Sequence, residues 1–356
     1  MPSWWQRFIS SYPIFPNLLA VTGLVWICYS LAHNISLTEA HHQGSIVEVV
    51  RSVSGSRFLV DKLIGLRAAY QDMFPEEIRV ILGNAFANWA VWLVVPFILF
   101  LELLFPCNPS QPLIGKGFIQ DAIWYVVNIP IAFLILFPVI NFLRGLFENH
   151  FGFLIMDSAT SWPMYARIIV ALVMGEFFRW FNHYVRHKVH PLWEFHAVHH
   201  SQKEINAFTD DRGHLVDLLI SSLVDYVPFI IFQVTNAYAM SIIFLYRPIH
   251  NRFVHANLRI NLGWLGYIFS SPQFHRVHHS ADPVHADKNF GVLFSFFDYL
   301  FGTAVPSRTV YPETGIHDSR FPTEDKVGLF MLPKNWGTQM LYPFTRIFKR
   351  NRAGIR

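Results

Sequence analysis

The sequence predicts an all-α protein that crosses a membrane several times, with four to six transmembrane helices. Of its 356 residues, 53% are hydrophobic and only 15% are charged, against about 25% charged residues in ordinary soluble domains. Its 35 phenylalanines and 11 tryptophans suit contact with lipid and with the membrane interface. Several apolar stretches approach the roughly 20 residues that a helix needs to cross the hydrocarbon core.

Five apolar stretches carry the prediction of transmembrane helices. They run over Ile14 to Leu31, Asn84 to Phe105, Ala122 to Leu143, Pro163 to Phe181 and Leu215 to Leu245. The last is long enough for a hairpin of two crossings. The fourth contains Glu176 and Arg179, which we expect to pair because a lone charge in an apolar helix is costly. The first follows a single basic residue and no cleavage site, so we interpret it as a retained helix.

The chain divides into three segments by composition. Residues 1–160 are predicted as an N-terminal transmembrane helical region, 161–310 as a histidine-rich domain and 311–356 as a basic C-terminal tail. With six spans, Arg186, Lys188, Lys203 and this tail fall on one face, which the positive-inside rule makes cytosolic. The segment 33–83 argues against this orientation, because its basic residues would lie outside.

Charge and cysteine usage narrow the classes of partner and ligand. The net charge of +4 comes largely from the C-terminal tail, which suits an anionic membrane surface, and nothing in the sequence indicates a nucleic-acid-binding protein. Cys28 and Cys107 lie in or beside apolar segments without a pairing pattern. Neither a disulfide framework nor a thiolate metal site is predicted, so any metal must use other ligands.

Thirteen of the 18 histidines fall between residues 183 and 285, and eight of them recur at fixed spacings. The three motifs are His183-x₃-His187, His196-x₂-His199-His200 and His275-x₂-His278-His279. Positions i, i+3 and i+4 share one face of a helix, so each motif would present a convergent set of imidazoles. A single histidine beside an apolar run is more often a hydrogen-bonded core residue than a ligand. Eight together would bury many unpaired polar atoms unless cations lay among them. We therefore predict two bound metal ions, although imidazole alone suits Fe, Zn, Cu and Ni alike.

The histidine motifs and two later segments together resemble the fatty acid hydroxylase/sterol desaturase superfamily. The segments that carry the resemblance are His183 to His187, Pro191 to Ser201, Pro272 to His279, Asn289 to Gly291 and Asp298 to Thr303. The resemblance covers roughly Arg179 to Pro306. It implies an integral-membrane, non-haem di-iron oxygenase with its histidine-box site in a cytosolic helical cap, which uses O₂ to hydroxylate or desaturate a sterol, fatty acyl chain or other membrane lipid.

The same resemblance assigns the metal ligands residue by residue. The predicted ligands are His183, His187, His196, His199, His200, His255, His275, His278 and His279, with His250, His214 and His190 as further candidates. Asp298, Asn289 and Arg212 are expected to act around the ligands, although a helix or turn cap is an equal alternative for Asp298. We expect no catalytic side chain beyond the metal centre.

Electrons are expected to come from a separate protein. The chain shows neither a cytochrome b5-like domain nor a Gly-rich nucleotide loop, so a cytochrome b5, a ferredoxin or a reductase is the expected donor. The sequence does not decide between hydroxylation and desaturation, and it predicts no oligomeric state. A membrane metal transporter or sensor is the alternative, but transporters place their ligands near the bilayer midplane, whereas these motifs lie beyond or between the apolar runs.

Overall fold

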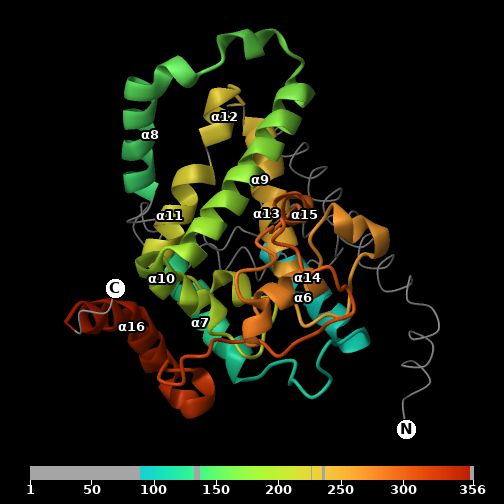
Figure 1. Cartoon of the computed structure of the whole chain (residues 1–356), viewed down its shortest axis with the longest axis vertical. Coiled ribbons are helices and arrows are strands. Elements are labelled where there is room, and N and C mark those ends of the chain that lie inside the picture. Colours follow the sequence, from blue (N-terminus) through green and yellow to red (C-terminus); the bar gives the residue numbers. More distant parts are fainter. Residues whose placement is uncertain (1–88, 132–136, 226, 235–236, 353–356) are drawn as a thin grey trace, which may run out of the picture.

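The computed structural model describes residues 89–131, 137–225, 227–234 and 237–352 (Figure 1). These residues form helices and loops, with three isolated β-bridges and no β-strand among them. The predicted all-α class is confirmed for this part of the chain. The predicted span from Ile14 to Leu31 lies outside the described residues.

Eleven α-helices make up the described part of the chain. They are α6 (Trp89–Leu104), α7 (Lys116–Ile131), α8 (Phe137–Phe151), α9 (Met164–Lys188), α10 (His190–His200), α11 (Leu215–Asp225), α12 (Val227–Ile231), α13 (Ala237–Val254), α14 (Pro272–His278), α15 (Phe296–Phe301) and α16 (Leu332–Arg352). Short 3-10 turns lie between several of them, including η4 (Thr209–Asp211) and η7 (Glu324–Lys326).

The longest described helix, α9, packs against α10, α11 and α12 and runs through the middle of the fold (Figure 1). It follows Pro163, and its last turn carries Arg186, His187 and Lys188, whose positive charge suits the negative end of a helix dipole. Val189 is extended and ends the helix. Pro191 stands in the first turn of α10, where its missing N–H costs no hydrogen bond. One helix therefore ends between the first two histidine motifs, and the next helix begins immediately after it.

Two of the predicted spans contain parts of several helices, whereas α9 continues beyond the predicted stretch from Pro163 to Phe181. The stretch from Leu215 to Leu245 contains α11, α12 and the start of α13, and the stretch from Ala122 to Leu143 includes parts of α7 and α8. The expected pair of Glu176 and Arg179 is confirmed at 3.2 Å, and the Tyr246 hydroxyl donates to the same carboxylate.

Within the described ranges, no helix combines the length and the apolar character needed to cross a membrane. The number of spans stays a prediction.

Two sets of packed helices support the histidine motifs. On one side α6 packs against α13, with Ile98, Leu101, Phe253 and Leu258 buried between them. On the other side α16 packs against α7 and α10. Residues predicted as a basic tail thus include a helix that lies directly on a motif-bearing helix.

A close backbone approach requires glycine at position 291. The Gly291 N–H donates to Asp298 Oδ2 at 2.7 Å. A Cβ on Gly291 would lie 2.9 Å from that carboxylate oxygen and would collide with the Phe294 carbonyl oxygen. Since neither backbone atoms nor a buried, hydrogen-bonded carboxylate can move away easily, glycine is the residue that fits.

The substitution Gly291→Ala is expected to lower the free energy of unfolding by about 1–3 kcal/mol, the usual cost of inserting a methyl group into a packed site. Thermal unfolding of the purified protein in detergent measures the change. The matched control is Gly337→Ala in α16, where an added Cβ meets no atom within 4 Å. An unchanged melting temperature for the Gly291 variant would show that the approach is looser than described.

Candidate metal centre

The structure gathers all nine predicted histidine ligands into two adjoining groups. The first group is His183, His187, His196, His200 and His278, and the second is His199, His255, His275 and His279. Within each group, the ring nitrogens that could bind an ion all lie within 4.8 Å of one another. Eight of the nine residues are buried, and the side chain of the ninth, His187, is only 5% exposed.

Each of the two pairs of consecutive histidines contributes one residue to each group. His199 and His200 belong to different groups, as do His278 and His279. Successive residues on a helix point about 100° apart, so each doublet faces two neighbouring spaces from one short segment. The His200 and His279 rings are stacked, with 4.3 Å between their centroids. This explains why the second and third motifs each end in two histidines.

In the first group, two unprotonated nitrogens face each other. His183 Nδ1 contacts the Phe290 carbonyl oxygen at 2.7 Å and His278 Nδ1 contacts the Lys288 carbonyl oxygen at 2.8 Å. A carbonyl oxygen only accepts hydrogen bonds, so both Nδ1 atoms carry the proton and the neutral rings keep a lone pair on Nε2. The two Nε2 atoms are 3.0 Å apart. Two lone pairs at that distance repel unless a cation lies between them.

The second group repeats this arrangement with different partners. His199 Nδ1 donates to the Arg212 carbonyl oxygen at 3.1 Å, and His255 Nδ1 donates to the Asn251 carbonyl oxygen at 2.7 Å. Their Nε2 atoms are 3.1 Å apart. Each group therefore holds at least one pair of facing lone pairs whose repulsion a cation between them would relieve.

The distances between these nitrogens match those between ligands of one metal ion. Two nitrogens that each lie about 2.1 Å from an ion at a right angle are about 3 Å apart. The remaining Nε2 to Nε2 distances are 2.9 Å for His183 and His196, 3.2 Å for His196 and His200, 2.8 Å for His255 and His275, and 3.2 Å for His275 and His279. His187 Nε2 is buried without a hydrogen-bond partner among the described residues. The donor set fits one transition metal ion in each group.

The segment that orients the first group adopts a costly backbone conformation. Asp287 and Asn289 both have φ of 58°, a left-handed conformation that is uncommon in residues with a Cβ. The Asp287 carboxylate lies 3.5 Å from His187 Nδ1. The Asn289 amide donates to the Phe274 carbonyl and accepts the Val305 N–H. These bonds hold the segment where its carbonyls reach the histidine rings.

Asp298 supports the same segment by accepting hydrogen bonds from its backbone. Its carboxylate accepts the N–H groups of Phe290 and Gly291 at 2.8 and 2.7 Å and the Thr303 hydroxyl at 2.6 Å. Asp298 touches none of the nine histidines by a hydrogen bond. It acts on His183 through the backbone of Phe290.

Arg212 joins the second group to two distant segments. Its carbonyl accepts the His199 proton, while its fully buried guanidinium pairs with Asp121 at 2.5 Å and Glu324 at 2.9 Å. Asp121 belongs to α7 and Glu324 to η7. Buried charges of this kind are stable only when all are paired, so α7 and the C-terminal segment fix the carbonyl that orients His199.

Asp217 is a partner of the site that the sequence analysis missed. Its carboxylate lies 3.1 Å from His196 Nδ1 and 2.9 Å from the Arg186 guanidinium. A carboxylate that contacts the outer nitrogen of a ligand fixes the ring orientation and raises its basicity. The sequence could have indicated this residue, because Asp217 is a charged side chain in the first turn of an apolar helix and needs a partner.

The three further candidates lie outside both groups. His250 Nε2 contacts the Val292 carbonyl, and His214 uses both nitrogens on backbone atoms of Met340 and Val216. His190 pairs with Glu194 near the surface. The ring nitrogens of these three histidines thus contact other protein atoms and do not point into either histidine group.

Burial keeps the nine histidines in the neutral form that binds metal. Loss of solvent lowers the pKa of every one, and for seven of them the pKa lies well below the ordinary value. For His187 and His255, nearby Asp287 and Asp210 oppose this decrease in pKa. The cluster therefore stays largely unprotonated at neutral pH.

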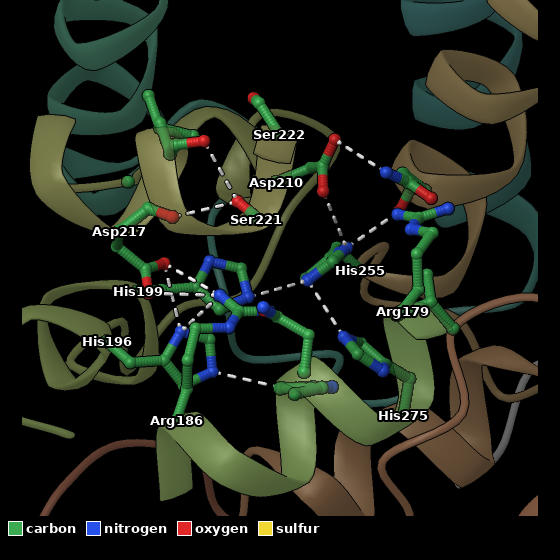
Figure 2. Close-up of a pocket in the computed structure, with 16 residues that line it drawn as sticks. Arg179, Arg186, His196, His199, Asp210, Asp217, Ser221, Ser222, His255 and His275 are labelled. Carbon is green, nitrogen blue, oxygen red and sulfur yellow. Dashed lines mark hydrogen bonds and ion pairs between the residues drawn. The ribbon is translucent and has the colours of Figure 1, made fainter. Parts of the chain in front are cut away.

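Two cavities reach the histidines from different sides. One, of about 230 Å³, is lined by α9, α11 and members of both histidine groups (Figure 2). The other, of about 360 Å³, touches His187, His200 and His278 of the first group and also Tyr342 and Arg346 of α16. The two cavities thus border the histidines with different sets of residues.

Comparison with known proteins agrees with this geometry. Residues 168–303 match the fatty acid hydroxylase family. The chain is similar to the ornithine lipid hydroxylase OlsE of Rhizobium tropici, with 28% identity over 52% of this chain and 53% of the relative. It is also similar to the alkylglycerol monooxygenases of Danio rerio and Homo sapiens, each 32% identical over 44% and 35% of this chain.

The chain matches about half of the length of the first relative, 33% of the second and 27% of the third. No solved structure matches it significantly. The resemblance predicted from the histidine motifs is confirmed by the family match and the relatives. That the nine histidines bind metal stays a prediction.

The purified protein, produced with iron, is expected to carry about two transition metal ions per chain, one for each group of nitrogen donors. Substituting Ala for His183 or His255 should remove about one ion, because each substitution affects one group. The exposed His150 in α8 provides the control, and His150→Ala should keep both ions. Elemental analysis measures the content, and two ions retained in both cluster variants would contradict the assignment.

The metal-free protein is expected to lose stability as the pH falls below about 6.5. The folded-state pKa values of the histidines are below their unfolded value of 6.5, so the unfolded chain binds more protons there. Each extra proton lowers the free energy of unfolding by about 1.4 kcal/mol per pH unit. Urea unfolding between pH 7.5 and 5.5 measures the slope. A stability that is constant or rises on acidification over this range would contradict the buried, neutral cluster.

Proposed function

We propose that the protein is a di-iron monooxygenase that uses O₂ to hydroxylate a membrane lipid, starting from the match of residues 168–303 to the fatty acid hydroxylase family. The observation that carries the proposal is the pairing of Nε2 lone pairs about 3 Å apart in each of two adjoining groups. Two metal ions at neighbouring positions fit this donor set, and the relatives supply the reaction class.

We infer iron, over zinc, copper and nickel, from the reaction class of the relatives and not from the ligands. Imidazole binds all four metals, but the relatives are named hydroxylase and monooxygenase. Iron held by these nitrogens would supply the activation of O₂ and the attack on a C–H bond. Hydroxylation inserts one oxygen atom of O₂ into that bond and reduces the other to water, which consumes two electrons and two protons. These names also favour an enzyme over a metal transporter or sensor, and hydroxylation over desaturation.

The protein's own residues keep the metal ligands in place while the iron reacts. Carbonyls of Phe290, Lys288 and Arg212 hold the rings of His183, His278 and His199 in one tautomer. The Asp217 carboxylate contacts Nδ1 of the His196 ring and itself accepts a hydrogen bond from Arg186. Outer contacts of this kind change metal affinity or activity by about 10 to 100-fold when they are lost.

A membrane location is supported by the apolar surface of two helices. In Figure 1, α8 and the start of α9 extend away from α10 and α14, which carry histidines. Large hydrophobic side chains are exposed on α8, on the start of α9 and on the segment between them, namely Phe142, Phe151, Phe153, Trp162, Tyr165 and Ile169. Several large exposed apolar side chains in one part of a molecule favour contact with lipid. We infer that this end enters the membrane and that the histidine end faces the cytosol.

We infer that a separate protein, such as a cytochrome b5, a ferredoxin or a reductase, supplies the electrons. The cavity of about 360 Å³ offers an approach to the first group from the side of α16. Trp193 lies along this approach, with its ring centroid 4.9 Å from that of His187 and 5.3 Å from that of His200. Aromatic contact with two ligands suits electron entry at this face.

The test is the incorporation of ¹⁸O into lipid. Membranes that contain the protein are incubated with ¹⁸O₂ and an electron donor, and extracted lipids are compared by mass spectrometry with those of membranes that lack it. A lipid that gains one ¹⁸O atom is expected. His278→Ala should abolish this product because it removes a ligand from the first group, while His150→Ala should retain it. Product formation by the His278 variant at normal protein levels would overturn the proposal.

A further inference from the structure

An exposed apolar stripe runs along α9 toward the histidines. In this helix the exposed residues that precede Lys188 are all apolar, namely Tyr165, Ile169, Val173 and Phe181. Positions i and i+4 are neighbours on a helix surface, so these side chains form a stripe that winds slowly around α9. The stripe covers about 24 Å of the helix. Its last member, Phe181, lies two positions before His183, so the apolar surface continues almost to the metal centre.

The stripe meets a second group of exposed apolar side chains near the histidines. This group comes from η5 (Gly263–Tyr267), from the two residues that follow η5 and from α15. We call it the α15 patch, and its members are Trp264, Tyr267, Ile268, Phe269, Leu300 and Phe301. Phe301 joins the patch to α9, because its ring is stacked on that of Trp180 with 4.6 Å between the centroids. Trp264 is 72% exposed and Leu300 is 67% exposed, so the rest of the described protein leaves both uncovered.

Fixed contacts hold the two parts of the α15 patch against each other. The Ser295 hydroxyl, directly before α15, donates to the Gly266 carbonyl in η5 at 2.9 Å. The Arg308 guanidinium donates to the Asn261 carbonyl at 2.8 Å and lies over the Tyr267 ring, 4.3 Å from its centroid. These contacts tie η5 to α15, so a well-held segment presents the exposed side chains.

The segments that form the patch carry cations and no exposed acid. Residues 258–281 contain no Asp or Glu, and residues 289–308 contain only Asp298, which is buried. Two arginines of these segments, Arg259 and Arg308, lie over the rings of Tyr311 and Tyr267. Tryptophan and tyrosine are enriched where lipid headgroups meet acyl chains, and arginine is attracted to anionic headgroups. The composition of the patch therefore fits the surface of a bilayer.

The distribution of exposed apolar side chains favours a bilayer over a protein partner. In Figure 1, α8 and α15 lie on opposite sides of α9, and α8 also exposes Phe142 and Phe151. A bilayer surrounds a protein, so it covers α8, the α9 stripe and the α15 patch together. A protein docked on the α15 patch would leave the apolar side chains of α8 in water.

A short series of hydrogen bonds connects the α15 patch to the first histidine group. Asp298, in α15, accepts the Phe290 N–H at 2.8 Å. The Phe290 carbonyl in turn accepts the proton of His183 Nδ1 at 2.7 Å. Both hydrogen bonds are buried. The depth at which a bilayer holds the patch thus also sets the depth of the histidines.

We propose that the α15 patch lies in the boundary between the headgroups and the acyl chains of the bilayer, with Trp264 and Leu300 among the upper parts of the chains and Arg259 and Arg308 beside the lipid phosphates. This contact holds the histidine groups close to the headgroups on the cytosolic side. The inference rests on the membrane location proposed above, and it adds where along α9 the bilayer ends.

Spin labels on single cysteines measure the depth of the patch. In a chain that carries Cys28→Ser and Cys107→Ser, nitroxides are attached at Trp264→Cys and Leu300→Cys. The purified full-length protein is then reconstituted in vesicles of phosphatidylcholine and phosphatidylglycerol. Collision rates with O₂, which concentrates in lipid, and with a water-soluble nickel chelate give the depth of each label. Both labels are expected about 5–10 Å inside the headgroup boundary, the usual depth of an interfacial apolar face.

The matched control is Phe330→Cys in η8 (Leu329–Met331), since Phe330 is also apolar and is 97% exposed. Exposed Asp325 and Lys334 flank η8 in the sequence, and α16, which follows it, lies well away from α15 in Figure 1. The label at position 330 should be open to the nickel chelate. Tyr165→Cys, in the α9 stripe, provides the reference for contact with lipid. Labels at 264 and 300 that are as open to the chelate as the label at 330 would overturn the inference.

Failure of this inference can be told from failure of the proposed function. The depth measurement needs neither iron nor an electron donor, so labels buried in lipid without any ¹⁸O incorporation would contradict the oxygenase and sustain the α15 patch. Incorporation of ¹⁸O with the labels at 264 and 300 in water would sustain the oxygenase and overturn the patch. A label at 165 that also lay in water would overturn the membrane location together with the patch.

Discussion

Carbonyl oxygens and carboxylates on the outside of the cluster hold the histidine rings so that their unprotonated nitrogens face one another. Four rings donate from Nδ1 to backbone carbonyls, and His196 contacts Asp217. Each donation settles the tautomer and turns a lone pair inward, where others lie about 3 Å away. In water such lone pairs would be hydrated, but the burial of the cluster removes that option. Much of the surrounding structure can be understood as the means of holding this unfavourable arrangement until cations relieve it.

The residues that support the cluster adopt conformations and charge arrangements that are themselves unfavourable. Asp287 and Asn289 adopt left-handed backbone conformations, Gly291 is pressed against the Phe294 carbonyl, and the Arg212 guanidinium is buried with two carboxylates. Strain and buried charge of this kind persist only where the surrounding structure fixes them, and they collect at functional sites. The packing of α6 against α13 and of α16 against α7 and α10 supplies that support.

The sequence predicted which histidines lie together better than it predicted the residues that hold them. Eight of the nine could be named from motifs with helical spacings and His255 from the family resemblance, and the structure gathers all nine. The partners of Nδ1 are mostly backbone carbonyls, which every residue possesses, so Phe290 and Lys288 carry no signal in their side chains. Asp217 did carry one, as an acid at the start of an apolar helix. The residues predicted as a basic tail include α16, whose packing on α10 depends on long-range contacts that local composition does not encode.

Histidines of both groups line one cavity, so any reaction in that cavity would depend first on metal ions in the two groups. The most direct measurement is the density of the metal ions in a structure of the iron-loaded protein, obtained by cryo-electron microscopy or by anomalous diffraction at the iron edge. Two peaks are predicted, one surrounded by His183, His187, His196, His200 and His278 and the other by His199, His255, His275 and His279. A single peak, or an ion held by residues outside these two groups, would contradict the account.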